Sequence, residues 1–316
     1  RVEVTGVSIN NALAVAGIAS VDRVTLSLAG NNSDVFPSMS YDIFTGAASK
    51  LAKITNLANT TITVTGVSAS QALTIANNPN VDAVTLSTNI LTASQFNALA
   101  GTNNTGPLTK VTNTGMTVTD IGIDNAIANN SAKVSSYSII DTSANFVTKL
   151  ADLNNPTFLG KISSITFTAA APMSFTKADW DTYTSSGLIT KIAGLTGLEV
   201  TISNAAASDL ASLASNTLVD RITLDSAVTS LTDAQYSSAV AAKLAIAPAA
   251  SPLNITGVSA ARAANLGTDN KVATLTVSDT AANVMSNLAA LQTAKFALSN
   301  VCLLYTSDAA DDSLRV

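Results

Sequence analysis

The chain of 316 residues contains no histidine and only one cysteine, Cys302. Catalytic triads built on histidine and zinc sites of the usual kind are therefore excluded. Charged residues make up only 12% of the chain, about half of the share usual in soluble proteins, and the net charge is −5. We expect no nucleic acid as a partner, because that would need a concentrated basic face. No apolar run approaches the length of a membrane-spanning helix, so we expect no membrane span.

Aromatic residues are also scarce, at 4% of the chain, so the expected core consists of Val, Ile, Leu and Ala. Few charges and many Thr, Ser and Asn residues are common in exported bacterial proteins, and the near absence of cysteine agrees with an oxidising exterior. We therefore expect an extracellular or cell-surface location. The chain begins at Arg1, and we expect it to be a fragment that is covalently continuous with further repeats in a longer protein.

Two motifs recur along the chain in step. The first motif occupies 2–8 and returns at 62–68 and 253–259. The second occupies 21–27 and returns at 81–87 and 219–225. Because two unrelated motifs move together, the sequence indicates a tandem array rather than one globular core.

The best-preserved repeat, 61–87, predicts a strand, a helix and a second strand. Residues 61–65 alternate β-branched apolar residues with threonine, which is typical of a strand with one buried face. Gly66 interrupts this strand, Ser68 is suited to cap a helix, and Pro79 ends the helix. Such a short strand–helix–strand unit indicates a crossover between parallel strands. The residues expected to face the interior are Val64, Val84, Leu86, Ile222 and Leu224, and those expected to face outward are Thr63, Thr65, Thr85 and Thr223.

Two further series of residues give the length of one coil. One series is the aromatic residue of a recurring helix, at Tyr41, Phe96, Trp180 and Tyr236. The other is a Lys before an aliphatic residue, at Lys53, Lys110, Lys191 and Lys243. Both spacings are multiples of roughly 27–30 residues, with two alternating coil types. We therefore predict an α/β fold, a single tandem-repeat β/α solenoid over 1–300 with a parallel sheet and helices along the outside.

The stretch 275–284 and its weaker copy at 139–146, together with the helices that contain the aromatic series, carry a family resemblance. They resemble repeats of very large bacterial secreted and surface proteins, which are often adhesin-like and exported by type I secretion. The resemblance implies a structural or adhesive role, with cell-surface glycans or other surface proteins as partners. It brings no catalytic residue, and the calcium-binding nonapeptide of such proteins is missing here.

The end of the chain differs from every repeat. Residues 302–312 resemble a translated sequencing-library adapter. We therefore interpret 301–316 as a non-native tail, which should pack poorly or make no repeat-like contacts from Cys302 onward.

Two sets of acidic residues are candidates for a catalytic or calcium-binding site. Asp22, Asp82 and Asp220 recur with the repeat, which favours a role in its turns over a glycosidase pair. Asp141 and Asp279 each precede a Thr at an expected helix start, which favours helix capping over calcium binding. We therefore assign no catalytic, cofactor-binding or metal-binding residue and expect no cofactor.

The four aromatic residues of the recurring helices could form a ladder that stacks on sugar rings, but their apolar neighbours favour packing between coils. Besides the structural or adhesive role, two functions stay open: a carbohydrate-active β-solenoid enzyme domain and a surface-layer lattice subunit. An active site should break the repeat, and the irregular stretches are 31–41 and 154–181.

Overall fold

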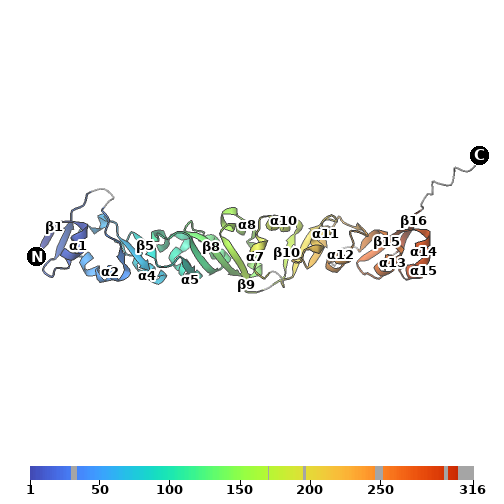
Figure 1. Cartoon of the computed structure of the whole chain (residues 1–316), viewed down its shortest axis with the longest axis horizontal. Coiled ribbons are helices and arrows are strands. Elements are labelled where there is room, and N and C mark those ends of the chain that lie inside the picture. The colour runs from blue at the N-terminus through green and yellow to red at the C-terminus, as the bar shows by residue number, and fades with distance from the viewer. Residues whose placement is uncertain (30–33, 170, 195–196, 246–251, 295–297, 305–316) are drawn as a thin grey trace, which may run out of the picture. The chain divides into compact units, whose positions relative to one another are not determined.

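The computed structural model describes residues 1–29, 34–169, 171–194, 197–245, 252–294 and 298–304 (Figure 1). Residues 31–33 of the irregular stretch 31–41 therefore lie outside the described residues. Contacts group the chain into two compact units. The first comprises Arg1–Ala169 and Gly187–Ala193, and the second comprises Ala170–Ser186 and Gly194–Val316. Both units are mixed α/β, with small sheets in which every strand pair is parallel. That the two units form one array over 1–300 stays a prediction.

The first unit contains three sheets, ordered β1-β2, β3-β4-β5 and β6-β7-β8-β9. Its strands are β1 (Glu3–Val7), β2 (Arg23–Leu26), β3 (Met39–Ser40), β4 (Thr63–Val67), β5 (Ala83–Leu86), β6 (Ile90–Thr92), β7 (Met116–Ile121), β8 (Val134–Asp141) and β9 (Ile162–Phe167). Its α-helices are α1 (Ile9–Ala16), α2 (Tyr41–Gly46), α3 (Ala48–Leu51), α4 (Ala69–Ile75), α5 (Ala93–Ala100), α6 (Ile123–Ala128), α7 (Ser143–Thr148), α8 (Leu150–Leu153) and α9 (Pro156–Leu159).

The second unit contains two sheets, ordered β10-β11-β12 and β13-β14-β15-β16. Its strands are β10 (Met173–Thr176), β11 (Val200–Ala205), β12 (Arg221–Leu224), β13 (Ser230–Thr232), β14 (Leu253–Val258), β15 (Val272–Asp279) and β16 (Leu298–Leu303). Its α-helices are α10 (Lys177–Ser185), α11 (Leu210–Ser215), α12 (Ser238–Lys243), α13 (Ala260–Leu266), α14 (Ala281–Ser286) and α15 (Leu288–Thr293). Within the described ranges, no helix has the length and apolar character that crossing a bilayer requires.

Five strands carry the same backbone irregularity. In β1, β4, β7, β11 and β14 the pairing register shifts just before the strand ends. A residue with a left-handed backbone conformation (positive φ) lies at each shift: Gly6, Gly66, Asp120, Asn204 and Gly257. Glycine adopts this conformation freely, and Asp and Asn tolerate it better than other residues. The sequence motif found the glycine copies but missed Asp120 and Asn204.

Eight of the helices, and the turn that contains Tyr236, bury the residue four positions after the Ser, Thr or Gly that precedes them. This residue is large in one coil type: Phe44, Phe96, Phe146, Trp180 and Tyr236. It is alanine in the other: Ala12, Ala72, Ala126 and Ala263. The sequence prediction was wrong at Tyr41, which begins α2 and is only half-buried, whereas Phe44 occupies the equivalent buried position. Side chains of unequal size can interdigitate between neighbouring coils.

The two coil types differ in length. Val64 pairs with Val84, and Val84 in turn pairs with Val111. The step from Val64 to Val84 spans 20 residues, whereas the step from Val84 to Val111 spans 27. The expectation of a single coil length throughout is therefore wrong for the shorter type. A parallel bridge directly follows each of the four recurring lysines, at Ile54, Val111, Ile192 and Leu244, so this series marks strand pairings.

The predicted inward residues Val64, Val84, Leu86 and Ile222 are buried. Leu224 is only half-buried, as are Thr63, Thr65, Thr85 and Thr223, which were expected to face outward. A Leu224→Ala substitution should therefore cost less than the about 2–5 kcal/mol of a fully buried leucine.

The start of the predicted tail continues the sheet. Cys302 of β16 pairs with Ser278 of β15, and the N–H of Leu304 donates to the carbonyl of Asp279 at 2.9 Å. Cys302 to Leu304 therefore make repeat-like backbone contacts, but their side chains are exposed, as expected of a tail that packs poorly. Residues 305–316 lie outside the described residues, and the adapter origin of the tail stays a prediction.

Candidate functional site

The recurring acids hold the starts of neighbouring strands together. Each carboxylate accepts the backbone N–H of a residue 20 positions earlier: Asp22 from Val2 at 2.7 Å, Asp82 from Ile62 at 2.8 Å and Asp220 from Val200 at 2.8 Å. Such a bond satisfies a backbone donor that would otherwise lack a partner at the strand start. The three carboxylates therefore have equivalent positions in the repeat and equivalent structural roles.

Asp141 and Asp279 each bind the starts of two helices. At the predicted helices they accept the N–H groups of the N-cap residues, Thr142 at 2.7 Å and Thr280 at 2.8 Å, while the side chains of these threonines cap the helices themselves. The Asp141 carboxylate also accepts the N–H of Ile123 at 2.8 Å, at the start of the preceding helix α6. In the same way Asp279 accepts the N–H of Ala260 at 2.9 Å, at the start of α13. Sequence spacing could not show this contact, because the helix lies one crossover earlier.

Three of the four recurring lysines bind backbone carbonyl groups of the preceding turn. Lys53 donates to Val21 at 2.6 Å, Lys110 to Val81 at 2.6 Å and Lys243 to Asn216 at 2.7 Å. Lys133, Lys161 and Lys271 make contacts of the same kind, which the sequence analysis missed. These lysines therefore satisfy carbonyl groups in turns rather than forming a basic surface for a partner.

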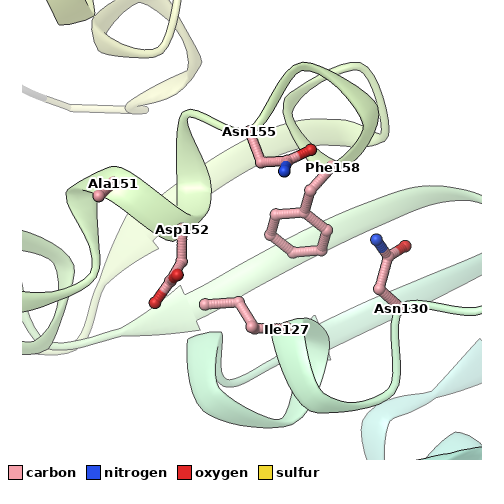
Figure 2. A pocket seen from close by; sticks show the side chains of 6 residues that line it. All are labelled: Ile127, Asn130, Ala151, Asp152, Asn155 and Phe158. Carbon is pink, nitrogen blue, oxygen red and sulfur yellow. The ribbon is translucent and has the colours of Figure 1, made fainter.

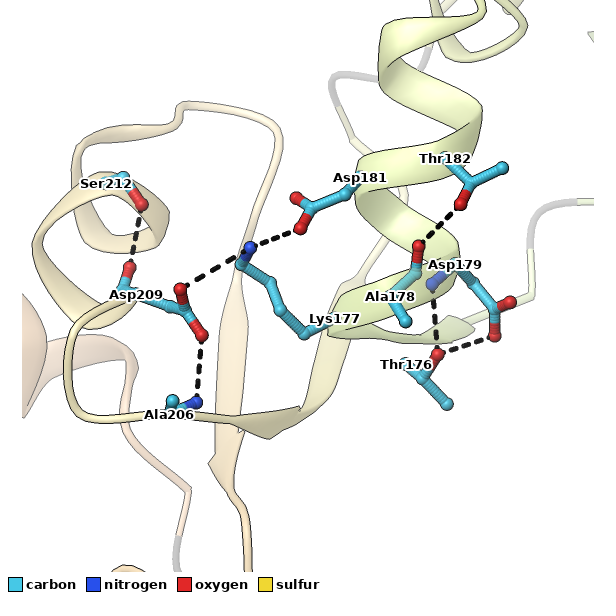
Figure 3. A network of polar contacts seen from close by, with 9 residues as sticks. All are labelled: Thr176, Lys177, Ala178, Asp179, Asp181, Thr182, Ala206, Asp209 and Ser212. Atoms are coloured by element: carbon cyan, nitrogen blue, oxygen red, sulfur yellow. Dashed lines mark hydrogen bonds and ion pairs between the residues drawn. The ribbon is translucent and has the colours of Figure 1, made fainter.

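A polar network occupies part of the irregular stretch 154–181 (Figure 3). The Lys177 ammonium lies 2.6 Å from the Asp181 carboxylate and 3.5 Å from that of Asp209. The hydrogen bond to Asp181 raises the pKa of Lys177, and the charge of Asp209 adds to the effect. Asp209 also accepts the N–H of Ala206 at 2.9 Å. Because Lys177 is held in its charged form, it is unsuited to act as a general base, and the network joins α10 to the turn before α11.

The same irregular stretch contributes to a hollow in the first unit (Figure 2). The hollow has a volume of about 200 Å³. Its lining comes from α6, α8, α9 and their adjoining turns: Ile127, Asn130, Ala151, Asp152, Asn155 and Phe158. Phe158 is buried and packs on Tyr137 with ring centroids 5.6 Å apart. Burial raises the pKa of Tyr137 to about 12, so the ring that supports Phe158 carries a neutral hydroxyl group.

Both asparagine side chains of the hollow have their oxygen atoms engaged. Lys161 donates to Oδ1 of Asn130 at 2.8 Å, and the N–H of Thr157 donates to Oδ1 of Asn155 at 3.1 Å. The amide nitrogens are then left as donors, and Figure 2 shows both on the side of Phe158. In the described part of the chain, neither these nitrogens nor the exposed Asp152 carboxylate has a hydrogen-bond partner.

The chemistry available in the hollow is binding rather than acid–base catalysis by a carboxylate pair. Asp152 is the only acid in its lining, whereas glycoside hydrolysis commonly uses two carboxyl groups. The nearby Asp124 is paired with Lys149 at 2.9 Å, and this hydrogen bond lowers the pKa of Asp124. Across the described ranges, three or more His, Cys, Asp or Glu side chains do not gather as metal ligands would.

The aromatic residues of the recurring helices do not form a sugar-binding ladder. Phe96 and Tyr236 are fully buried and Trp180 is 4% exposed, so none of the three offers a ring face to a ligand. Packing between coils is the interpretation that fits.

No family model, curated protein or solved structure matches this chain. The resemblance to repeats of bacterial adhesin-like proteins therefore stays a prediction.

Proposed function

We propose that the chain is a structural or adhesive repeat segment of a large exported bacterial surface protein and that it has no catalytic activity. It would act as a spacer that also presents a binding surface. The architecture proposed for this role is a β/α solenoid, in which each coil contacts only its neighbours and the array gains reach with every coil.

The observation that carries the proposal is that the recurring polar side chains bind backbone groups of the protein itself. Asp22, Asp82 and Asp220 bind backbone N–H groups of a neighbouring strand, and three of the four recurring lysines bind carbonyl groups of a neighbouring turn. Side chains that serve the stacking of coils in this way are not arranged around a substrate. The alternation of large and small buried residues supports the same stacked arrangement.

The solenoid is tested by small-angle X-ray scattering of the purified chain. A compact protein of this length has a radius of gyration of about 20 Å. We expect a clearly larger value, because a solenoid extends in one direction. A value no larger than that of a compact protein would exclude the solenoid.

The role at the surface is tested on intact source cells. External protease should remove the epitope recognised by an antibody against the chain, while a cytoplasmic control protein survives. Protection of the chain until the cells are lysed would contradict export. Incubation with a panel of polysaccharides provides the second readout, since release of reducing ends by the chain would show that it is an enzyme.

A further inference from the structure

The hollow lies where one repeat departs from its counterpart. The crossover from β8 to β9 contains α7, α8 and α9, whereas the described part of the crossover from β15 to β16 contains only α14 and α15. The extra helix α9 begins after Asn155 and carries Phe158, which both line the hollow. At the place that corresponds to Asn130, eight residues after the N-cap of its helix, the second unit has Gly267. An added Cβ there would collide with the Cβ of Ala294, so that site is closed.

The hollow combines oriented donors, a charged acceptor and an apolar wall. The amide nitrogens of Asn130 and Asn155 supply the donors, and the Asp152 carboxylate supplies the acceptor. Ile127 supplies the apolar wall, whereas Phe158 is only 3% exposed and closes the floor of the hollow. The Asp152 carboxylate interacts with the charge of Lys149 but has no hydrogen-bond partner in the described chain, and such a carboxylate accepts strong hydrogen bonds from hydroxyl groups. Because the two amides are already oriented by Lys161 and the N–H of Thr157, little ordering is needed when a ligand binds.

We propose that this hollow binds a single pyranose ring, at the end of a cell-surface glycan. This inference rests on the proposed adhesive function and names its ligand class and site. A pyranose offers adjacent hydroxyl groups to the amides and the carboxylate, and its C–H groups contact the half-buried Ile127. The volume of about 200 Å³ is smaller than that of pockets for drug-sized ligands, so it suits one ring rather than a chain of sugars.

The test is a titration of the full chain with methyl pyranosides, followed by ¹H–¹⁵N spectra. The probes are the methyl glycosides of glucose, galactose, mannose, fucose and N-acetylglucosamine. At least one of them should shift the side-chain amide signals of Asn130 and Asn155 in a saturable way, with a dissociation constant on the order of millimolar. The other probes establish which hydroxyl configuration is preferred.

Two variants and one control locate the binding. Asp152→Ala removes the acceptor and should weaken binding at least about tenfold. Ala151→Trp places a bulky group at the exposed rim and should abolish it. Asp42→Ala is the matched control, since Asp42 is an exposed acid on α2 outside the hollow and should leave binding unchanged. Circular dichroism and thermal melting confirm that each variant is folded.

Several outcomes would overturn the proposal: no probe shifts the two amides, or both variants bind like the parent chain, or methylammonium saturates the hollow while no glycoside does. A glycan array then separates the two sources of the ring. Binding to terminal residues of immobilised glycans supports the cell-surface ligand, whereas binding of free glycosides alone contradicts it. Failure here leaves the spacer role intact if scattering and surface proteolysis succeed.

Discussion

Two regions of the molecule share one local design and differ in how tightly they are packed. The first module runs from β7 to β9 and the second from β14 to β16. In both, an aspartate at the end of the middle strand binds the N–H at the start of the preceding helix and the amide of an asparagine four residues later. We call these hydrogen bonds of the aspartate the polar frame of the module. Because both modules have them, the polar frame does not depend on which apolar side chains the module buries.

The apolar contents differ in size. The first module buries Tyr137 and Phe146 completely, and Phe146 packs edge-on against Phe167 with centroids 5.4 Å apart. At the corresponding positions the second module has Leu275, which is buried, and Val284, which is half-buried. More apolar area is thus removed from water per side chain in the first module, and the second depends more on its polar frame.

The two modules differ in how closely their helices approach one another. In the second module α13 lies so close to the end of α15 that only glycine fits at Gly267. In the first module Asn130 occupies the corresponding position, α9 is inserted, and the hollow lies between the helices. Close packing and a binding site are therefore alternative uses of one framework.

The largest effect is expected from removing the buried ring of the first module. Phe146→Ala should lower the free energy of unfolding by about 3–5 kcal/mol, because it leaves a cavity in a fully buried site. Val284→Ala, at the matching half-buried position, should cost only about 1 kcal/mol. Urea unfolding of both variants measures the difference. Equal losses would show that the two modules are packed alike.

A smaller effect is expected at the close approach of α13 and α15. Gly267→Ala should cost about 1–3 kcal/mol, because the added methyl group collides with Ala294. The second substitution Ala294→Gly should recover only part of this loss in the double variant, because the added Cβ would also lie 2.7 Å from the Ala294 Cα; a double-mutant cycle measures the recovery. If Gly267→Ala is neutral by itself, the helices are not in close contact and the contrast with the hollow fails.

The smallest effect concerns the polar frame and depends on pH. The hydrogen bond from Asn283 lowers the pKa of Asp279, with further contributions from the N–H groups of Ala260 and Thr280. A carboxyl group whose pKa is lower in the folded state stabilises the fold above its unfolded pKa of about 3.9 and loses this effect as pH falls through the folded value. Asp279→Asn should therefore destabilise the chain at pH 7 and flatten the loss of stability below about pH 4.

The control for this experiment is Asp42→Asn, because the Asp42 carboxylate has no hydrogen-bond partner in the described chain. Chemical unfolding at pH 7 and at pH 3 distinguishes the variants. Parallel pH profiles of Asp279→Asn and the parent chain would mean that the carboxylate charge is not part of the frame.

Much of the fold could be predicted from spacing alone. The helix at 69–75 was predicted from Ser68, whose hydroxyl accepts the N–H of Gln71. The parallel strands were predicted because a strand, a helix and a second strand follow one another in the short segment 61–87, as in a crossover. The equivalence of Asp120 and Asn204 with the repeated glycines could not be predicted, since it depends on a backbone conformation that three residue types can adopt.

The candidate site could be placed only coarsely. The sequence analysis indicated 154–181 as a break in the repeat, and Asn155 and Phe158 of the hollow lie there. It gave no reason to join them to Ile127 and Asn130, because these belong to the preceding crossover. The only possible signal was the extra length between the two motifs that flank α9.

The sequence by itself determined the repeat, the residue types that alternate between coils and the crossovers between parallel strands, because these depend on local periodicity and turn chemistry. Only the tertiary structure decided which second helix Asp141 binds, which carbonyl groups the lysines bind and where a hollow stays open. These contacts join residues about 20 to 30 positions apart, and their geometry depends on how neighbouring strands and helices pack. Local periodicity specifies the residues of each strand–helix segment, and tertiary packing specifies which groups each side chain contacts.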